Sequence, residues 1–294
     1  MKTFFKSALS FVLSLLALLL LISALISSTA LNEDFMLDKM YAVKYYDDAQ
    51  DRFIDDASSI FTSNNLLSGT LSAYVNKDDM RATTKANVHA FYIGTAGRSD
   101  ASGLFNNMQK EIIKNLEAST SVVTDEVEKV VSQIVEQTQY IYSQYTILPM
   151  EPVITTLRNV YKFAYSPIFF VAILAVAIMS GLALYRLCAD VSELADWLTC
   201  GALGTGLACF ILPLICKLSG AAKGLMDSSL IYYKLFLECA NSILMTAIIA
   251  GAIIIIGTIV ARIAVGKVLK RDKNTNNETG KFHYKPSQEA VQKP

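Results

Sequence analysis

Four long stretches without a charged residue constrain this chain more than any other feature. They cover residues 7–32, 167–185, 198–216 and 239–261. Crossing the roughly 30 Å hydrocarbon core of a bilayer takes about 20 apolar residues in a helix. Backbone groups inside lipid must be hydrogen-bonded within the segment, which leaves helix as the form for each stretch. The sequence therefore predicts an all-α, polytopic membrane protein with four transmembrane helices.

Composition agrees with this class. Hydrophobic residues make up 53% of the chain and charged residues 18%, against about 45–50% and about 25% in average globular chains. The 26 basic and 26 acidic residues cancel, so the chain has no overall attraction to nucleic acid. We expect the lipid bilayer as the main partner and no nucleic acid.

The first stretch has two interpretations. Lys2 and Lys6 form a basic start, and Ser28-Thr29-Ala30 has the small residues of a cleavage site, as in a secretory signal. The apolar part of a signal peptide is about 7–15 residues long, and this stretch is longer. The length favours an uncleaved N-terminal anchor over residues 1–31, and both interpretations place the next segment outside the cytoplasm.

Basic residues predict the orientation. They gather before the first stretch, after the second and after the fourth, and such ends face the cytoplasm and contact anionic lipid headgroups. The set is Lys2, Lys6, Arg186, Arg262, Lys267, Lys270, Arg271 and Lys273. Lys217, Lys223 and Lys234, in the predicted outer connection, run against the rule. We expect a multi-pass cell-membrane protein with both termini cytoplasmic.

Residues 32–165 are then extracytoplasmic, and their apolar spacing predicts a helical bundle. This segment has 12 basic and 18 acidic residues, a net charge of −6, and no cysteine. Asp78 or Asp79 can cap a helix that Gly94 ends. Apolar side chains repeat at helical or coiled-coil-like intervals in two runs. These are Leu104, Met108, Ile112 and Leu116, and then Val123, Val127, Val130, Ile134 and Ile141.

The remaining chain divides into three parts. Pro149 and Pro152 interrupt the chain before residues 153–165, which we expect to run on into the second span. Residues 166–266 form a three-helix membrane bundle, whose amphipathic outer connection 217–238 is predicted to lie on the membrane interface. The polar residues 267–294 cannot form a core, which predicts a disordered, basic cytoplasmic tail.

Known catalytic signatures are missing from the sequence. It contains no HExxH, GxxxxGK, G-x-S-x-G or CxxC motif. His89 and His283 each stand without a second histidine, which argues against a metal site. No ionisable residue lies centrally in a span, which argues against a pump. We therefore expect a non-enzymatic protein without catalytic residues, metal or cofactor.

Small residues recur four apart in the later spans, and such pairs allow close helix packing. They favour a compact bundle within one chain, with a homo-oligomer as the second interpretation. The residues are Ala177, Gly181, Ala202, Gly206, Ala247, Gly251, Gly257 and Ala261. Cys216 and Cys239 flank the outer connection; they are either a disulfide or, as membrane cysteines more often are, small packing residues.

Several local features also carry a resemblance. They are 31–35 leaving the first span, Tyr45-Tyr46, Leu67-Ser68-Gly69, Asp78-Asp79-Met80-Arg81 and Ala90-Phe91-Tyr92-Ile93-Gly94. With them the chain resembles a loose class of uncharacterised bacterial four-span integral membrane proteins that carry a helical extracytoplasmic domain between the first two spans. The resemblance implies a bacterial cytoplasmic-membrane location and brings no catalytic residue or ligand.

Three functions fit these features. The first is a non-enzymatic membrane protein that presents its extracytoplasmic domain to envelope proteins or the cell surface. The second is an oligomeric channel or transport component. The third is a sensor subunit that signals through a separate partner, because a tail of about 30 residues is too short for an output domain.

Overall fold

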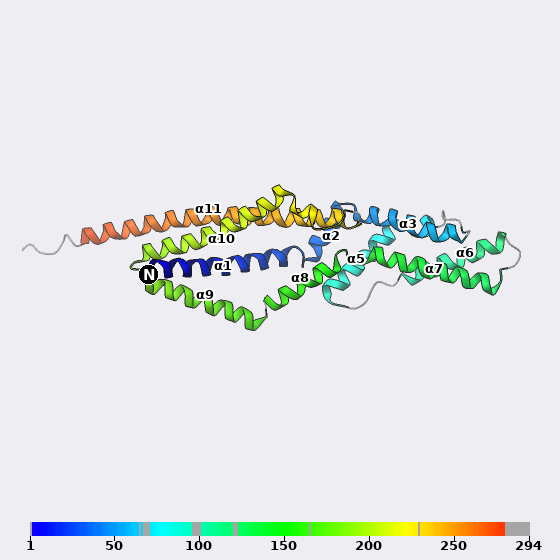
Figure 1. Ribbon diagram of the computed structural model, residues 1–294, viewed down its shortest axis with the longest axis horizontal. Coiled ribbons are helices and arrows are strands. Elements are labelled where there is room, and N and C mark those ends of the chain that lie inside the picture. Colours follow the sequence, from blue (N-terminus) through cyan, green and yellow to red (C-terminus); the bar gives the residue numbers. More distant parts are fainter. Residues whose placement is uncertain are drawn as a thin grey trace, which may run out of the picture. The chain divides into compact units, whose positions relative to one another are not determined.

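The described part of the chain is helical and contains no strand (Figure 1). The computed structural model describes residues 2–64, 66, 71–95, 101–119, 123–164, 166–228 and 230–279. They divide into two compact units, which we call the membrane unit and the helical domain. The membrane unit combines Met1–Leu21, Pro167–Leu214 and Ala247–Pro294, and the helical domain combines Ile22–Ser166 and Ile215–Thr246.

Three helices are long and apolar enough to cross a membrane, which confirms a membrane-embedded protein. They are α1 (Lys2–Ser28), α10 (Val191–Ser219) and residues Tyr233–Val268 of α11 (Tyr233–Thr279). The remaining predicted span corresponds to α9 (Pro167–Leu187), in which Val171–Leu187 is a shorter apolar helix.

In the membrane unit, α10 packs closely against α11. A methyl group added at Gly206 would lie 2.8 Å from Cγ1 of Ile255 and 3.3 Å from the carbonyl oxygen of Gly251. Nearer one end of the same helix pair, the Arg262 guanidinium binds the Asp196 carboxylate with an Nε–Oδ1 distance of 2.7 Å. Because contacts move backward along α11 as they move forward along α10, these two helices are antiparallel.

Polar side chains join α1 to α10. Lys6 pairs with Glu193, and the Ser10 hydroxyl donates to the carbonyl oxygen of Trp197 at 2.7 Å. The hydroxyls of Ser14 and Thr205 lie 3.1 Å apart. These contacts are four residues apart on α1, and four and then eight residues apart on α10. They advance in the same direction along both helices, so α1 and α10 are parallel.

The helical domain contains seven shorter α-helices and one 3₁₀ helix among the described residues. The bounds are α2 (Glu33–Ala42), α3 (Tyr45–Ser63), α4 (Leu71–Tyr74), α5 (Lys77–Ile93), α6 (Ser102–Ser119), α7 (Asp125–Thr146), α8 (Glu151–Ala164) and η2 (Ala221–Gly224). Gly94 ends α5 in the left-handed region at φ +78°, as predicted. The cap is Asn76, however, whose side chain accepts from the amide of Asp79. Asp78 and Asp79 lie in the first turn, where their charge favours the helix dipole.

Aromatic rings form the centre of this domain. The Tyr142 ring makes edge contacts with Phe53 and Phe105, with centroid distances of 5.5 and 5.3 Å. Its hydroxyl donates to the side-chain oxygen of Thr83 at 3.0 Å. This hydrogen bond matters because a buried phenol hydroxyl without a partner would destabilise the core.

The predicted seam on α7 faces the core only in part, through Ile134 and Ile141. Val127 and Val130 are exposed, while Val131, Ile134 and Val135 are buried. The buried face continues through Thr138 and Tyr142. A prediction based on aliphatic spacing does not include these two residues. Their hydroxyl groups are compatible with a core only because each has a hydrogen-bond partner inside the fold.

Part of the outer connection packs into the domain core, which corrects the prediction for residues 217–238. Leu235 is fully buried in the same cluster as Cys239, and Ile231, Tyr232 and Phe236 pack against that cluster. These side chains cover protein rather than lipid. The helical domain therefore includes residues 215–246 in addition to the predicted segment.

Two predicted boundaries were also wrong. Residues 153–165 do not continue into the next span: α8 ends at Ala164, and α9 begins at Pro167, where proline suits the first helical position. The tail was predicted disordered from residue 267, yet α11 continues to Thr279. No Gly or Pro interrupts 267–279, and residues 280–294 lie outside the described residues.

Candidate ligand pocket

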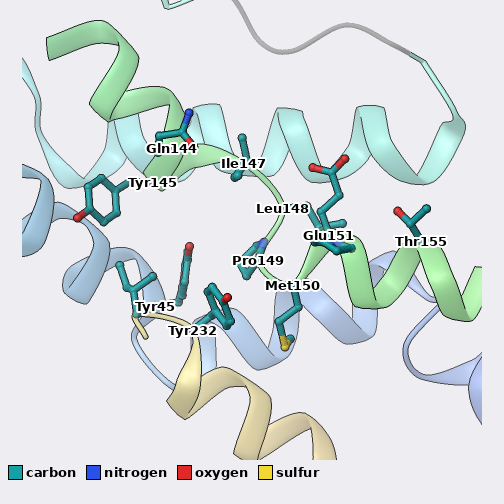
Figure 2. A pocket seen from close by; sticks show the side chains of 12 residues that line it. Tyr45, Gln144, Tyr145, Ile147, Leu148, Pro149, Met150, Glu151, Thr155 and Tyr232 are labelled. Carbon is teal, nitrogen blue, oxygen red and sulfur yellow. The ribbon is translucent and has the colours of Figure 1, made fainter. Parts of the chain in front are cut away.

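A pocket of about 720 Å³ opens in the helical domain where three chain segments meet (Figure 2). One segment is the turn between α7 and α8, the second is the start of α3, and the third immediately precedes α11. The lining residues are Tyr45, Gln144, Tyr145, Ile147, Leu148, Pro149, Met150, Glu151, Pro152, Thr155, Ile231 and Tyr232.

The α7–α8 turn forms one wall because its sequence cannot stay helical. Ile147 ends α7 in an extended conformation, and Pro149 disfavours helix at the residue before it. Met150 then adopts φ +59° and is buried, and its carbonyl accepts from the amides of Val153 and Ile154 as α8 begins. The turn holds Leu148 and Met150 against the pocket.

Backbone strain is concentrated at this pocket. Among the described residues, only two non-glycine residues have positive φ, Met150 and Lys44. Lys44, at φ 56°, immediately precedes Tyr45 and begins α3. Each such residue costs about 1–2 kcal/mol relative to ordinary backbone, and such residues cluster at functional sites. The strain therefore supports a functional role for the pocket.

Three tyrosines lie at one end of the pocket (Figure 2). Tyr45 is buried, Tyr232 precedes α11, and the Tyr145 hydroxyl donates to Oδ2 of Asp56 at 2.5 Å. Burial raises the pKa of Tyr45, and the neighbouring phenols of Tyr46, Tyr145 and Tyr232 raise it further. Burial and the bond to Asp56 raise the pKa of Tyr145 to about 12. Both phenols are therefore neutral at physiological pH.

The pocket has one charged lining residue, Glu151, and no basic one. Among the described residues, the Glu151 carboxylate has no hydrogen bond or ion pair, and its side chain is half-buried. Gln144 supplies an amide from the last turn of α7. A ligand held here would meet aromatic and aliphatic surface, one amide and one negative charge.

The predicted packing residues differ in their surroundings. Gly206 and Gly251 lie at the close approach of α10 and α11, with Ala247 buried and Ala202 half-buried nearby in sequence. A methyl group on Gly181 or Gly257 would meet no atom within 4 Å. Ala177 is half-buried and Ala261 exposed. Among the predicted small residues, those of α10 and α11 around Gly206 and Gly251 therefore lie at a close helix contact. Gly181 and Gly257 do not.

The predicted topology residues also divide. Lys6 and Arg262 form ion pairs with acidic residues of α10, whereas Lys2, Arg186 and Lys267 are exposed. The side chains of Lys270, Arg271 and Lys273 lie outside the described residues. Lys6 was expected at lipid headgroups, but its side chain is only 10% exposed against Glu193.

Cys216 and Cys239 are both free thiols in the structure. Cys239 is buried in the domain core while Cys216 is exposed on α10. A bridge would require the buried thiol to leave its packing. Cys239 is thus a small core residue, the alternative favoured for membrane cysteines.

Sequence reasoning missed the pocket as a site. Pro149 and Pro152 mark the turn, but Tyr45 and Tyr145 belong to a set of aromatic residues that is more typical of a core or a membrane interface than of a ligand-binding surface. Tyr232 is far from both in the sequence, so its position beside them required the fold. The left-handed conformation of Met150 has no sequence signal, because methionine rarely adopts it.

Comparison with known proteins gives no relative. No family model matches the chain, and neither the curated proteins nor the solved structures contain a match. The function must therefore be argued from the pocket itself.

Proposed function

We propose that this protein is a non-enzymatic, four-span membrane protein whose extracytoplasmic helical domain binds a component of the cell envelope. The single observation that carries the proposal is the pocket at the α7–α8 turn. Its size lies within the roughly 300–1,000 Å³ of typical ligand pockets, and its lining is mostly apolar with few polar groups. These are the properties of a binding site.

The proposed topology has both termini in the cytoplasm. It is supported by the helix directions, because α1 is parallel to α10 and α11 is antiparallel to it. If α9 is the second span, residues 22–166 and 215–246 share the outer side. The basic residues in the first two turns of α1 and from Arg262 onward agree with this orientation.

Retention of α1 is part of the proposal. Three successive turns of this helix contribute a specific polar contact to α10 through Lys6, Ser10 and Ser14. A methyl group at Gly201 would lie 3.0 Å from the carbonyl oxygen of Ser10. Such fitted contacts are expected of a permanent member of the bundle rather than of a removed signal.

Cysteine accessibility tests the topology. All five native cysteines are replaced by alanine, and single cysteines are introduced at exposed positions, Gln137→Cys in α7 or Thr3→Cys in α1. A membrane-impermeant maleimide added to intact cells should label Gln137→Cys at once and Thr3→Cys only after permeabilisation. The reverse labelling would overturn the orientation.

Site-specific crosslinking tests the binding function. A photoreactive residue at Gln144, at the pocket, should crosslink to an envelope component in intact cells. The same residue at exposed Asn107 on α6 is the matched control and should not. Equal adducts at both positions, or none at Gln144, would contradict a binding role for the pocket.

A sensor subunit is the second candidate, and one observation favours it. Tyr232 lines the pocket and directly precedes α11, which is uninterrupted from Tyr233 to Thr279. An occupant would contact the residue immediately before this helix. Hydrogen exchange along 262–279 should then change when the Gln144 adduct forms, and unchanged exchange would leave binding without signalling.

A further inference from the structure

We propose that the pocket at the α7–α8 turn takes a small apolar organic cation, of the substituted-ammonium class. The inference rests on the proposed binding function and specifies the chemistry of its ligand. It is carried by the tyrosines, the unpaired carboxylate and the lack of basic residues among the lining side chains.

The charge of the lining selects against anions. Glu151 is its one ionisable carboxylate, and no Lys, Arg or His is present among the lining residues. The surrounding segment 32–165 has a net charge of −6. A carboxylate or phosphate in this pocket would therefore meet repulsion and no cationic partner, while a positive group would be attracted from solution.

The tyrosine rings suit a cation more than a neutral polar ligand. Tyr45, Tyr145 and Tyr232 come from three different segments and lie together at one end of the pocket (Figure 2). The faces of aromatic rings carry negative electrostatic potential and bind ammonium groups, especially where water is excluded. Tyr145 is held in place by its bond to Asp56, so its ring needs no ordering on binding.

The remaining lining describes the body of the ligand. Ile147, Leu148, Met150 and Ile231 are apolar, and an alkyl or aryl group would cover them. The half-buried Glu151 carboxylate has no partner in the described residues and lies away from the three tyrosines (Figure 2). It therefore adds negative potential to the pocket, which favours a positively charged ligand over an uncharged one.

A free cation fits better than the headgroup of a choline lipid. Such a headgroup carries a phosphate beside its ammonium group, and the lining offers no basic residue to receive the phosphate. The proposal therefore commits to a small molecule without an anionic group.

Binding can be tested on the full chain in lipid nanodiscs, with phenyltrimethylammonium as the probe, benzenesulfonate as its anionic counterpart and empty nanodiscs as the blank. Titration calorimetry should detect the cation and not the anion. The affinity for the cation should fall about tenfold in Glu151→Gln and in Tyr232→Leu. Glu128→Gln, an equal charge change at an exposed residue of α7, should bind like the unchanged protein.

Two results would overturn the cation proposal: no binding of phenyltrimethylammonium, or the same affinity in Glu151→Gln as in Glu128→Gln. The crosslink at Gln144 distinguishes failure of the proposed ligand class from failure of the proposed binding function. If that crosslink forms while the cation does not bind, the ligand class is wrong and the binding function stands. If both fail, both proposals fall.

Discussion

Gly251 lies against the backbone of Gly206, so that a methyl group on Gly251 would be 2.8 Å from the Gly206 carbonyl oxygen. The same methyl would be 2.6 Å from the backbone nitrogen of Phe210. Both neighbours are main-chain atoms of α10, which cannot rotate away as a side chain can. The fit of α10 against α11 therefore depends on the missing side chain.

We expect Gly251→Ala to lower the stability of the membrane unit by about 1–3 kcal/mol, because the helices must separate to admit the methyl group. Gly257→Ala is the matched control in the same helix, where the methyl would meet no atom within 4 Å. It should be neutral or stabilising by up to about 1 kcal/mol. Thermal unfolding in detergent compares the two, and equal effects would contradict the close approach.

The contact between Lys6 and Glu193 predicts that the first helix remains in the mature protein. Mass spectrometry of protein purified from membranes should detect residues 1–30 at the start of the chain. Lys6→Met should lower the thermal midpoint, because it leaves the Glu193 carboxylate without its cation. Adding Glu193→Met should recover part of the loss. A mass lacking residues 1–30 would refute retention.

Strain at Lys44 predicts an unusual response to glycine. Lys44→Gly should raise the thermal midpoint or leave it unchanged, because glycine adopts φ near +56° without steric cost. The control is Lys85→Gly, at an exposed interior position of α5, which should lose about 0.5–1 kcal/mol. Losses of the same size at both positions would contradict the left-handed conformation of Lys44.

The bond between Tyr145 and Asp56 predicts alkaline sensitivity. Because the folded pKa of Tyr145, about 12, lies above the ordinary value of 10.0, folding favours the protonated phenol. This contribution is complete below about pH 10 and is lost as the pH rises toward 12. Chemical unfolding over this range, with tyrosinate absorbance followed in parallel, should show a smaller loss in Tyr145→Phe. Identical pH profiles would contradict the prediction.

The parts of the fold predicted from sequence are those decided by local chemistry. Charge-free length determined the apolar helices, and Gly94 ended α5 because glycine tolerates its left-handed φ. Asn76 displaced Asp78 and Asp79 as the cap, because the cap needs extended backbone at its own position and helix favours charge in the turn that follows.

The parts that could not be predicted depend on long-range packing. The buried face of α7 includes Thr138 and Tyr142, whose hydroxyls become compatible with a core only after they find carbonyl or hydroxyl partners. Likewise, the sequence placed Leu235 at the lipid interface, whereas in the fold it is buried in the core of the helical domain. The candidate pocket belongs to this group, since Tyr45 and Tyr232 meet only in the folded domain.

The burial of Leu235 and Cys239 in the helical domain sets an order of events during biosynthesis. These side chains follow α9 and α10 in the chain, so the ribosome must complete both helices before it supplies them. Until then, the core of the helical domain lacks the side chains of Leu235 and Cys239 and stays partly exposed. The core of the domain is therefore completed only after α9 and α10 have been synthesised.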